Sequence, residues 1–362
     1  MDRTFYSDLV DKSLANEVLP DEICRNILSS DELELLPLLD AAFQIRKKFT
    51  GKEVSVHIIN NAQNGFCPED CHYCAQAKTS KADIEDYPLK ADAEILAEAK
   101  RAYESGAFRY CMVFAGRGPS PRRVETLARL IREIKQTYPI QVCVSAGLMN
   151  EDAVSKLKEA GLDRLNHNLN TSQRNYPNIC TTHTFQDRLD TLTRAKNAGL
   201  ELCSGMIVGM GEDGSDVIDV AKNLRALRTR SIPINFLVPI EGNTLPQISS
   251  LTPEYCLRVL CLYRFLNPDC ELRVAAGREG HLRSLQVMAL YPANSLFLDG
   301  YLNTKGSSRA KTLRMIKDAG FTIKSEIDLN ALLEREEAGQ KPFAVEDYKN
   351  FMKDLGDLRP MR

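Results

Sequence analysis

Three cysteines, Cys67, Cys71 and Cys74, lie within eight residues of the chain and form a CxxxCxxC run. Cysteine thiolates are the usual protein ligands of iron–sulfur clusters. A cluster of four irons that is held by only three cysteines keeps one iron free of protein, much as a catalytic zinc site keeps one coordination position open. The run therefore predicts a 4Fe-4S cluster whose open iron can bind a reactant.

Two other kinds of metal site also use short cysteine runs. A structural zinc ion needs a fourth ligand, and although His72 lies inside the run, no second CxxC or HxxxH pattern follows it. A ferredoxin has a further cysteine close by, often followed by proline, whereas Pro68 follows the first cysteine here. Disulfides are rare in chains without a secretory signal. Ligand count and spacing thus favour the three-cysteine cluster.

The elements that must position these cysteines follow a regular alternation. After residue 50, short apolar runs rich in β-branched residues alternate with longer helical patterns, which is typical of parallel strands joined by helices. The pattern over 121–137 opens on a proline that suits a first helical turn. The eight predicted strands are 54–59, 109–114, 141–145, 164–168, 201–208, 233–237, 271–275 and 295–298.

Eight strand–helix units over about 270 residues predict an α/β fold of the (β/α)8 TIM type, for which about 250 residues is typical. An open doubly wound sheet would show the same alternation, so the barrel rests on the strand count and the polar positions. Helical patterns at 21–29 and 31–48 predict that residues 1–50 form an N-terminal helical lead-in over one end of the barrel. The barrel itself is expected over 51–321, and 322–362 are expected to form a C-terminal helical tail, a docked helix with a flexible end.

Four residues that could form a second site lie in different predicted strands: Cys111, Cys143, Cys203 and Arg273. Side chains of a small barrel alternate between the lumen and the helix layer, so residues far apart in sequence can converge inside. A buried cysteine is an ordinary small core residue, but a charge in an apolar strand is costly unless it is paired or ligating. A buried anionic cluster would give Arg273 a partner. Spacing alone leaves core packing and a second metal site both open.

The other cysteines are expected to pack as small hydrophobic residues. Cys256 and Cys261 lie in a helical pattern, Cys24 in the N-terminal lead-in and Cys270 in a turn. Cys180 lies in a loop near the predicted site.

The composition of the chain limits the kinds of molecule that it is expected to bind. The chain of 362 residues is 43% hydrophobic and 27% charged, with a formal net charge of −2, so nothing indicates a nucleic-acid surface or an anionic membrane. A small molecule is the expected partner. The first residues carry acids and lack an apolar stretch of signal-peptide length, and no run of 18 apolar residues occurs. A cytoplasmic location is therefore expected, with the eleven cysteines as reduced thiols or metal ligands.

Taken together, four motifs resemble those of the biotin synthases, a family within the radical S-adenosylmethionine superfamily. The resemblance covers roughly residues 40–320. The motifs are GFCPEDCHYC at 65–74, NHNLNTS at 166–172, CSGMIVGMGE at 203–212 and RVAAGRE at 273–279.

The resemblance implies a (β/α)8 barrel with two clusters. It implies that a 4Fe-4S cluster is held by Cys67, Cys71 and Cys74. It also implies that an auxiliary 2Fe-2S cluster deep in the barrel is ligated by Cys111, Cys143, Cys203 and Arg273. In such enzymes the open iron chelates S-adenosylmethionine, and an electron cleaves the sulfonium to a 5'-deoxyadenosyl radical. This radical abstracts hydrogen from dethiobiotin, and sulfur from the auxiliary cluster closes the ring of biotin. The barrel must then keep a reactive carbon radical dry and next to its target.

The resemblance also assigns roles to five further residues. Arg188 should pair with the carboxylate of S-adenosylmethionine, a bidentate task that suits a guanidinium. Tyr73 should flank the adenine, and Asn168 should contact both cofactor and substrate. Asn168, Asn170 and Asn235 are expected to bind dethiobiotin, although strand-end hydrogen bonding is their alternative role. Asn170 stands where many family members carry aspartate.

The sequence also leads to expectations about protein partners and leaves alternative functions open. The resemblance implies a reducing electron-transfer protein of the flavodoxin or ferredoxin type and a homodimer. A related radical enzyme acting on another small molecule, such as a maturase or a carbon-skeleton mutase, is the main alternative, and there the strand cysteines need not bind iron. A nonenzymatic iron–sulfur or zinc-binding module is a third possibility.

Overall fold

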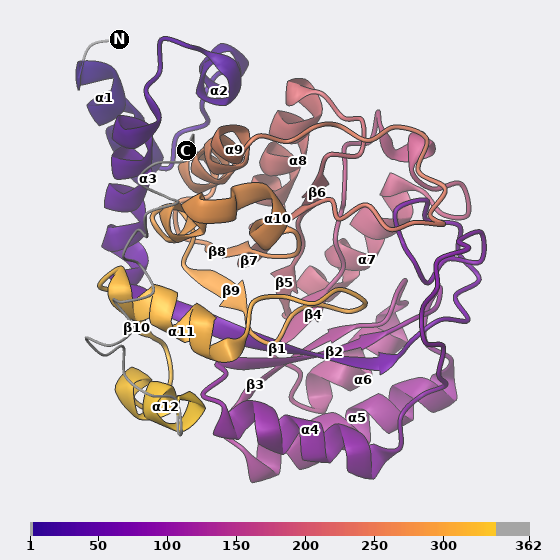
Figure 1. The fold of residues 1–362 in the computed structure, drawn as a ribbon. Coiled ribbons are helices and arrows are strands. Elements are labelled where there is room, and N and C mark those ends of the chain that lie inside the picture. Colours follow the sequence, from indigo (N-terminus) through magenta and orange to yellow (C-terminus); the bar gives the residue numbers. More distant parts are fainter. Residues whose placement is uncertain (1–2, 338–362) are drawn as a thin grey trace, which may run out of the picture.

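In the computed structural model, which describes residues 3–337, parallel strands close into a barrel that helices surround (Figure 1). The strands are β1 (Glu53–Gln63), β2 (Arg109–Phe114), β3 (Gln141–Ser145), β4 (Arg164–Asn166), β5 (Glu201–Cys203), β6 (Met206–Val208), β7 (Ser231–Phe236), β8 (Glu271–Val274), β9 (Ser295–Phe297) and β10 (Thr322–Ile323). Their order is β1-β2-β3-β4-β5-β7-β8-β9, with β6 paired to β7, and pairing of β9 with β1 closes the ring. The predicted parallel barrel is confirmed.

Helices follow most of the strands and form the outer layer. The α-helices are α1 (Arg3–Leu14), α2 (Asp21–Ser29), α3 (Leu35–Thr50), α4 (Asp92–Glu104), α5 (Pro121–Thr137), α6 (Glu151–Glu159), α7 (Phe185–Asn197), α8 (Gly214–Ala226), α9 (Pro253–Leu266), α10 (Arg278–Leu282), α11 (Arg309–Asp318) and α12 (Leu329–Glu336). Two short 3-10 helices lie at Tyr176–Asn178 and Arg283–Leu290.

Helix α5 shows how local sequence sets these elements. Pro121 occupies the first helical turn, and the hydroxyl of Ser120 accepts a hydrogen bond from the backbone N–H of Arg123. Both features favour a helix start, since they provide a fixed φ and satisfy one free amide. Leu127 and Ile131, four residues apart, are buried on the same face of the helix. The helix therefore has the bounds that the sequence predicts.

The single strand predicted over 201–208 is wrong, because the structure has two strands there. The chain leaves β5 at Ser204 and Gly205 before β6 begins. At this point the backbone passes very close to β7: a Cβ atom on Gly205 would lie 1.8 Å from the carbonyl oxygen of Pro233. Such an approach requires glycine and disrupts regular pairing, which the alternation of side chains along the sequence does not reveal.

The N-terminal helices lie elsewhere than predicted. They were expected over one end of the barrel, but α3 packs against α9 and α2 packs against α8 and α9, on the outer helix layer (Figure 1). Helix α3 begins at Leu35 rather than near residue 31. The buried guanidinium of Arg46 donates to the carbonyl oxygens of Leu290 and Glu53, so it ties α3 to the start of β1.

The C-terminal segment joins the barrel. Thr322 and Ile323 of β10 pair in parallel with the first residues of β1. Helix α12 packs against α11 through buried leucines that include Leu332 and Leu333. The rest of the predicted tail lies outside the described residues, and the division of the chain at residues 50 and 321 stays a prediction.

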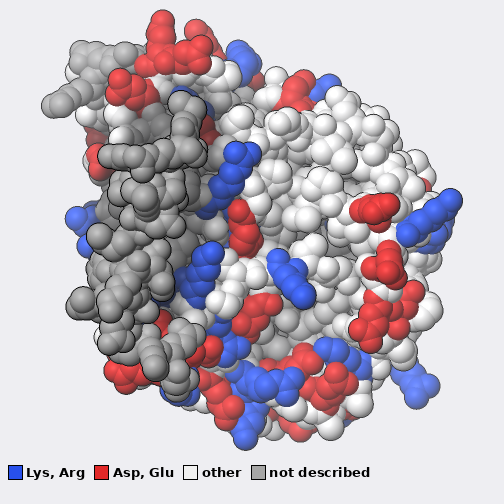
Figure 2. Space-filling model, viewed as in Figure 1, with Lys and Arg blue, Asp and Glu red and all other residues white. Residues whose placement is uncertain are grey.

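The surface fits a chain with little net charge. On the face drawn in Figure 2, basic and acidic side chains are interspersed around broad uncharged areas. Among residues 3–337, no helix combines the length and hydropathy that would let it cross a membrane.

The barrel has an inner and an outer core. Along β2, Tyr110 and Met112 face the helices and belong to the main core, whereas Cys111 between them points into the lumen. This is the alternation expected of a strand, and it directs one cysteine of each of three strands to the barrel axis.

Candidate active site

The three strand cysteines meet inside the barrel. Cys111 of β2 lies opposite Cys143 of β3 in the strand register. Together with Cys203, Ala275 and Phe297 they form a small buried cluster that is separate from the main core. The structure therefore brings together the thiols that the sequence predicted to converge.

The three thiols influence one another's ionisation. Cys143 stands between the other two, and its hydrogen bonds lower the pKa of Cys111 and of Cys203 well below the usual thiol range. The same hydrogen bonds, of which the one with Cys111 has the largest effect, raise the pKa of Cys143 well above the usual thiol range. Nearby positive charge from Arg273 also favours the thiolates of Cys111 and Cys203. Buried thiolates beside a cation are a suitable donor set for a metal cluster.

Arg273 reaches this cluster from β8. Its Nη1 lies 3.8 Å from the sulfur of Cys203, while its Nε donates to Ser295 Oγ at 3.0 Å and its Nη2 donates to Ser231 Oγ at 2.9 Å. The guanidinium is also stacked on the ring of Phe297, 4.9 Å from its centroid. Arg273 is thus held rigidly at the edge of the thiol cluster.

Sequence reasoning missed the carboxylate beneath it. Glu271, which is two residues earlier on the same strand, pairs with Arg273 and also lies 3.2 Å from Arg109, 3.1 Å from Arg164 and 3.1 Å from His57. Burial opposes the ionisation of this carboxyl, but the surrounding positive charge outweighs it and holds the pKa of Glu271 well below its usual range. The spacing of two residues on one strand was the signal that could have identified this partner.

The CxxxCxxC run lies in the loop between β1 and α4. Cys71 is buried and Cys67 and Cys74 are half-buried. The loop is anchored by the carboxylate of Asp70, whose Oδ1 accepts the backbone N–H groups of Thr181 at 2.9 Å and Thr182 at 3.1 Å. Within the described residues, the three thiols of the run do not converge within 4.8 Å of one another.

Cys180 is buried in the main core, as the sequence predicts, but it also has polar partners. Its sulfur lies 3.8 Å from that of Cys71 and 3.3 Å from Nδ1 of His183. The hydrogen bond with the Cys71 thiol is the main cause that lowers the pKa of Cys180 to about 4. The remaining four cysteines are buried in the main core, as predicted: Cys24, Cys256, Cys261 and Cys270.

One cavity connects the loop with the barrel thiols. Its volume is about 300 Å³, and its wall includes Tyr73 and Cys74 from the loop and Cys111, Cys143 and Cys203 from the strands. This is the lower end of the size range of small-molecule sites. A ligand in the cavity would lie between the two sets of thiols.

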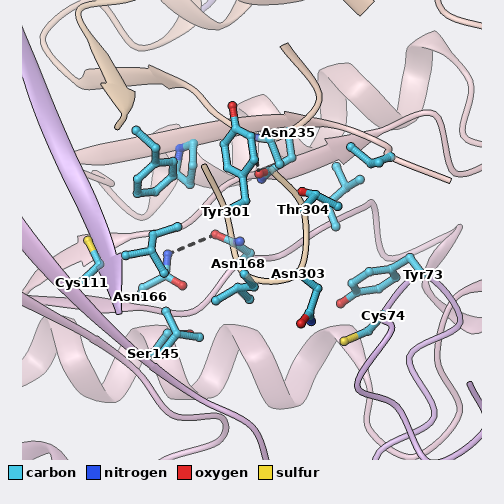
Figure 3. A pocket seen from close by; sticks show the side chains of 18 of the residues that line it. Tyr73, Cys74, Cys111, Ser145, Asn166, Asn168, Asn235, Tyr301, Asn303 and Thr304 are labelled. Atoms are coloured by element: carbon cyan, nitrogen blue, oxygen red, sulfur yellow. Dashed lines mark hydrogen bonds between the residues drawn. The ribbon is translucent and has the colours of Figure 1, made fainter. Parts of the chain in front are cut away.

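Figure 3 shows this arrangement from close by. Cys111 lies at one side of the cavity and Tyr73 and Cys74 lie at the other, with Asn166 and Asn168 between them. The amide of Asn166 donates to Asn168 Oδ1 at 3.3 Å and lies 3.1 Å from the sulfur of Cys203. Asn166 was not predicted as a site residue, although it stands in the same NHNLNTS motif.

The predicted asparagines are brought to this region with different partners. Asn168 and Asn235 both line the cavity, and Asn235 also bonds the backbone of Met206 and Ala276, the strand-end role noted as its alternative. Asn170 is buried beside the cavity and donates from Nδ2 to the hydroxyl of Tyr73 at 2.5 Å.

Arg188 lies behind the cavity wall rather than in it. From α7 it donates to the carbonyl oxygen of Asn168 at 2.8 Å, to His183 Nε2 at 2.8 Å and to the hydroxyl of Tyr176. Its charge also favours the thiolate of Cys71. The guanidinium is therefore close to the cysteine loop, although it does not line the cavity.

The loop after β9 completes the cavity and was missed. Tyr301, Asn303 and Thr304 line it, and the hydroxyl of Tyr301 donates to the carbonyl oxygen of Ala275 at 2.9 Å and to the carboxylate of Glu279 at 3.0 Å. Their polar side chains follow a strand at the end of the barrel where the other site residues gather, which was the available signal.

Both thiol sets fit iron–sulfur clusters. The loop supplies three thiols and presents one of them, Cys74, to the cavity. The lumen supplies three buried thiols with the guanidinium of Arg273 beside them. Soft thiolate donors select such clusters, and the two sets differ in ligand number as two different clusters require.

Two family models match the chain. Residues 64–224 match the Radical SAM superfamily, and residues 233–322 match the Biotin and Thiamin Synthesis associated domain. Two solved structures share the fold at low identity. The FeFe-hydrogenase maturase HydG from Carboxydothermus hydrogenoformans has a TM-score of 0.77 at 17% identity, covering 90% of this chain and 81% of that one. A methylornithine synthase has a TM-score of 0.74 at 20% identity, covering 90% and 100%.

Curated relatives are much more similar in sequence. The biotin synthase of Magnetococcus marinus is 53% identical over 315 residues, which is 87% of this chain and 98% of the relative. Those of Acaryochloris marina and Bacillus subtilis are 51% and 46% identical, covering 94% and 91% of this chain and 97% and 98% of theirs. With such identity over nearly the whole length of these relatives, the chain belongs to the biotin synthase family.

Proposed function

We propose that this enzyme inserts sulfur into dethiobiotin to form biotin, with S-adenosylmethionine, a 4Fe-4S cluster and an auxiliary 2Fe-2S cluster as its cofactors. The observation that supports this best is the cavity whose wall includes Cys74 as well as Cys111, Cys143 and Cys203. Cys74 and Cys111 lie at opposite sides of it (Figure 3). A substrate that must meet a radical and then a sulfur atom has to lie between the sources of both.

In this proposal the cofactors carry the chemistry and the chain positions them. Cys67, Cys71 and Cys74 hold the 4Fe-4S cluster and leave one iron for S-adenosylmethionine. When bound, the two clusters and S-adenosylmethionine supply the electron, the hydrogen-abstracting radical and the transferred sulfur. The anchoring of the loop by Asp70, which accepts two backbone N–H groups, fixes the positions of the three thiols.

The barrel lumen holds the second cluster. Cys111, Cys143, Cys203 and Arg273 are its proposed ligands. Glu271 bonds Nη2 of the guanidinium while Nη1 lies beside Cys203, so it orients Arg273 and balances its charge. A ligand that is held in this way keeps its geometry while the cluster changes.

The cavity wall binds the organic substrates. Asn168 and Asn235 present amides at strand ends, and Asn170 orients the hydroxyl of Tyr73 at 2.5 Å. Amides can donate to and accept from a ureido ring, which is the polar part of dethiobiotin. Arg188 is proposed to pair with the carboxylate of S-adenosylmethionine, because its fork of donors matches a carboxylate.

Apolar residues line a large part of this cavity. Ile59, Val113, Leu237 and Phe297 contribute to the same wall. Their role in the proposal is to exclude solvent and other hydrogen donors, so that the reactive carbon meets only its target.

The partners and the location are also proposals. A reducing protein of the flavodoxin or ferredoxin type would supply electrons, two copies of the chain would form a homodimer, and the enzyme would work in the cytoplasm. Within residues 3–337, which include all eleven cysteines, none forms a disulfide, and this fits a reducing compartment.

The test is anaerobic reconstitution with iron and sulfide, followed by Mössbauer spectroscopy and by assay of 5'-deoxyadenosine and biotin. Wild-type protein should contain both cluster types and form biotin. Cys143→Ser should keep the 4Fe-4S signal and cleave S-adenosylmethionine but form no biotin, whereas Cys67→Ala should lose both the signal and the cleavage. A wild-type protein with one 4Fe-4S cluster, unaffected by Cys143→Ser, would instead favour a related radical enzyme with another substrate.

A further inference from the structure

Cys71 of the cysteine loop lies against Cys180, a cysteine that has no role in the proposed sulfur insertion. Their sulfur atoms are 3.8 Å apart, and both side chains are buried. Cys180 belongs to the segment between β4 and α7, 109 residues further along the chain. Two free thiols in contact are the starting arrangement for a disulfide.

The backbone holds the two cysteines side by side. A disulfide needs Cα atoms less than about 7 Å apart, so the two segments must be close. Before Cys71, the carboxylate of Asp70 accepts the backbone N–H of Thr181 at 2.9 Å. After it, the backbone N–H of His72 donates to the carbonyl oxygen of Ile179 at 2.8 Å. Both chain neighbours of the first cysteine are thus hydrogen-bonded to the chain neighbours of the second.

Little has to move for the bond to form. An S–S bond is about 2.05 Å long, so the two sulfurs must approach by about 1.8 Å, a distance that side-chain rotation covers. The Cys180 sulfur then loses its contacts with Asp70 Oδ1 at 3.3 Å, Thr182 Oγ1 at 3.6 Å and His183 Nδ1 at 3.3 Å. Contacts of a thiol are weak. The three groups also keep stronger partners, in backbone N–H groups for Asp70 and in Glu69 for the other two.

An oxidant can reach Cys180 without entering the cavity between the two sets of thiols. Cys180 lines a different cavity, of about 550 Å³. Exposed residues that include Gln173 and Gln186 line it too, so it opens to solvent. The walls of the two cavities share no residue, and Cys71 is in neither wall. Cys180 is therefore the thiol that a reagent from solvent meets first.

We propose that Cys71 and Cys180 form a reversible disulfide in the cluster-free protein, with a low-molecular-weight disulfide as the oxidant. The Cys180 thiolate attacks one sulfur of the oxidant and releases a first thiol. The Cys71 thiolate then attacks the Cys180 sulfur of this mixed disulfide and releases a second. The two cysteines lose two protons and two electrons, which the oxidant takes up as it becomes two thiols.

This disulfide and the 4Fe-4S cluster exclude each other, because both use the sulfur of Cys71. The exclusion rests on the proposed role of Cys71 as a cluster ligand, whereas the disulfide itself does not. In the disulfide, Cys71 is protected from oxidation to a sulfinic acid, which most proteins cannot reverse. A dithiol reductant restores both thiols. The disulfide therefore preserves a protein that has lost its cluster.

The experiment uses the full chain, freed of iron by anaerobic chelation, reduced and then exposed to glutathione disulfide. Free thiols are alkylated before digestion with trypsin. The peptide 53–78 contains Cys71 and the peptide 175–188 contains Cys180, so their disulfide links two peptides that mass spectrometry identifies. Further cleavage after Glu69 separates Cys71 from the first cysteine of the run.

Matched variants show which thiols react. In the wild type, the linked peptides should be the main disulfide product. They should disappear in Cys180→Ser and Cys180→Ala, and they should persist in Cys67→Ala and Cys74→Ala. Far-UV circular dichroism of each variant verifies its fold.

The cluster gives a separate comparison. Oxidised wild type should show no 4Fe-4S signal in Mössbauer spectra after reconstitution until a dithiol reductant is added. Protein that is reconstituted before exposure to the oxidant should give no linked peptides. If the peptides formed equally with and without the cluster, Cys71 would not be a ligand, and the proposed exclusion would be wrong although the disulfide exists.

Two results would overturn the disulfide itself. One is an oxidised wild type in which the three cysteines of the run pair only with one another or with glutathione. The other is the same yield of linked peptides in the folded and in the denatured chain, since the fold would then not direct the pairing. Neither result depends on biotin formation, because dethiobiotin and S-adenosylmethionine are absent.

Discussion

Glu271 and Arg273, two residues apart on β8, form an ion pair inside the barrel. Alternate residues of a strand face the same side, so the carboxylate and the guanidinium both point into the lumen. The guanidinium continues to the sulfur of Cys203 at 3.8 Å. One carboxylate thus connects a layer of buried arginines with the thiol cluster above it.

Replacing Glu271 by glutamine should therefore affect both stability and the auxiliary cluster. The change leaves Arg109, Arg164 and Arg273 without their shared counter-charge, and removing one partner of a buried ion pair typically costs about 3–5 kcal/mol. We expect a loss of that size in the free energy of unfolding, measured with denaturant. The 2Fe-2S signal in Mössbauer spectra should fall while the 4Fe-4S signal persists.

A matched control for this prediction is Glu201→Gln. Glu201 also pairs with Arg164, at 2.6 Å, but it is about half exposed, and exposed pairs contribute ~0–1 kcal/mol. A control variant as unstable as Glu271→Gln would show that the burial of Glu271 and its greater number of partners do not determine the loss.

Acid sensitivity should depend in part on Asp216. Burial opposes ionisation of this carboxyl, but the hydroxyl of Ser172 at 2.5 Å, the backbone N–H of Asp213 and the guanidinium of Arg174 outweigh it, so the pKa of Asp216 is lowered. A group with a depressed folded-state pKa stabilises the protein above its unfolded pKa, about 3.9 for Asp, and this contribution disappears as the pH falls through the folded value.

Asp216→Asn should thus lower the free energy of unfolding at pH 7 by about 1–2 kcal/mol, the size of a lost helix cap with its ion pair. The difference from wild type should shrink when unfolding is measured near pH 3. The exposed pair of Asp269 with Arg230 supplies a control, and Asp269→Asn should change little at either pH. A gap between wild type and Asp216→Asn that widens in acid would contradict the sign of this argument.

The fold could be read from the sequence because its signals are local and repeated. Apolar runs at the spacing of strands and helices predict the eight positions of the barrel, and the Pro121 turn gives one helix its bounds. The predictions that were wrong concern features that depend on contacts between residues far apart in the sequence. The break between β5 and β6 arises where Gly205 meets Pro233, and the place of the N-terminal helices depends on which outer helices they cover.

Some residues of the candidate site could likewise be predicted from the sequence, and others could not. Cys111, Cys143, Cys203 and Arg273 could be predicted to converge because strand alternation directs them inward. The contacts of Cys180 could not be predicted, since its position beside Cys71 is set by a loop that folds back from a segment about 110 residues away. No periodic pattern carries that information.

Asn170 adopts a backbone conformation that limits its replacements. Its φ is +70°, a left-handed value that asparagine and aspartate tolerate and that costs other residues about 1–2 kcal/mol. Asn170→Asp should keep the fold, with the hydroxyl of Tyr73 now donating to the carboxylate. Asn170→Ala should lower the free energy of unfolding by at least about 1 kcal/mol and also lose the contact that orients Tyr73.

Steady-state kinetics distinguish the two Asn170 variants further. If Asn170 binds dethiobiotin, Asn170→Ala should raise its KM by about 10-fold, the value of one hydrogen bond of roughly 1.5 kcal/mol, while Asn170→Asp stays near wild type. An unchanged KM in the alanine variant would leave Asn170 a purely structural role.

Arg188→Lys should separate charge from geometry. Lysine keeps the positive charge beside Cys71 but cannot offer two parallel donors to a carboxylate. The Kd for S-adenosylmethionine, measured by equilibrium dialysis with the reconstituted protein, should rise about 10-fold or more, since hydrogen bonds to charged groups contribute ~1.5–3 kcal/mol. The control is Arg194→Lys on the same helix, whose guanidinium donates to the backbone oxygen of Met149 at 3.4 Å and does not line the cavity. If both variants bound the cofactor equally well, Arg188 would not contact S-adenosylmethionine. Its role would then be structural, through its hydrogen bonds to His183 and Asn168 behind the cavity wall.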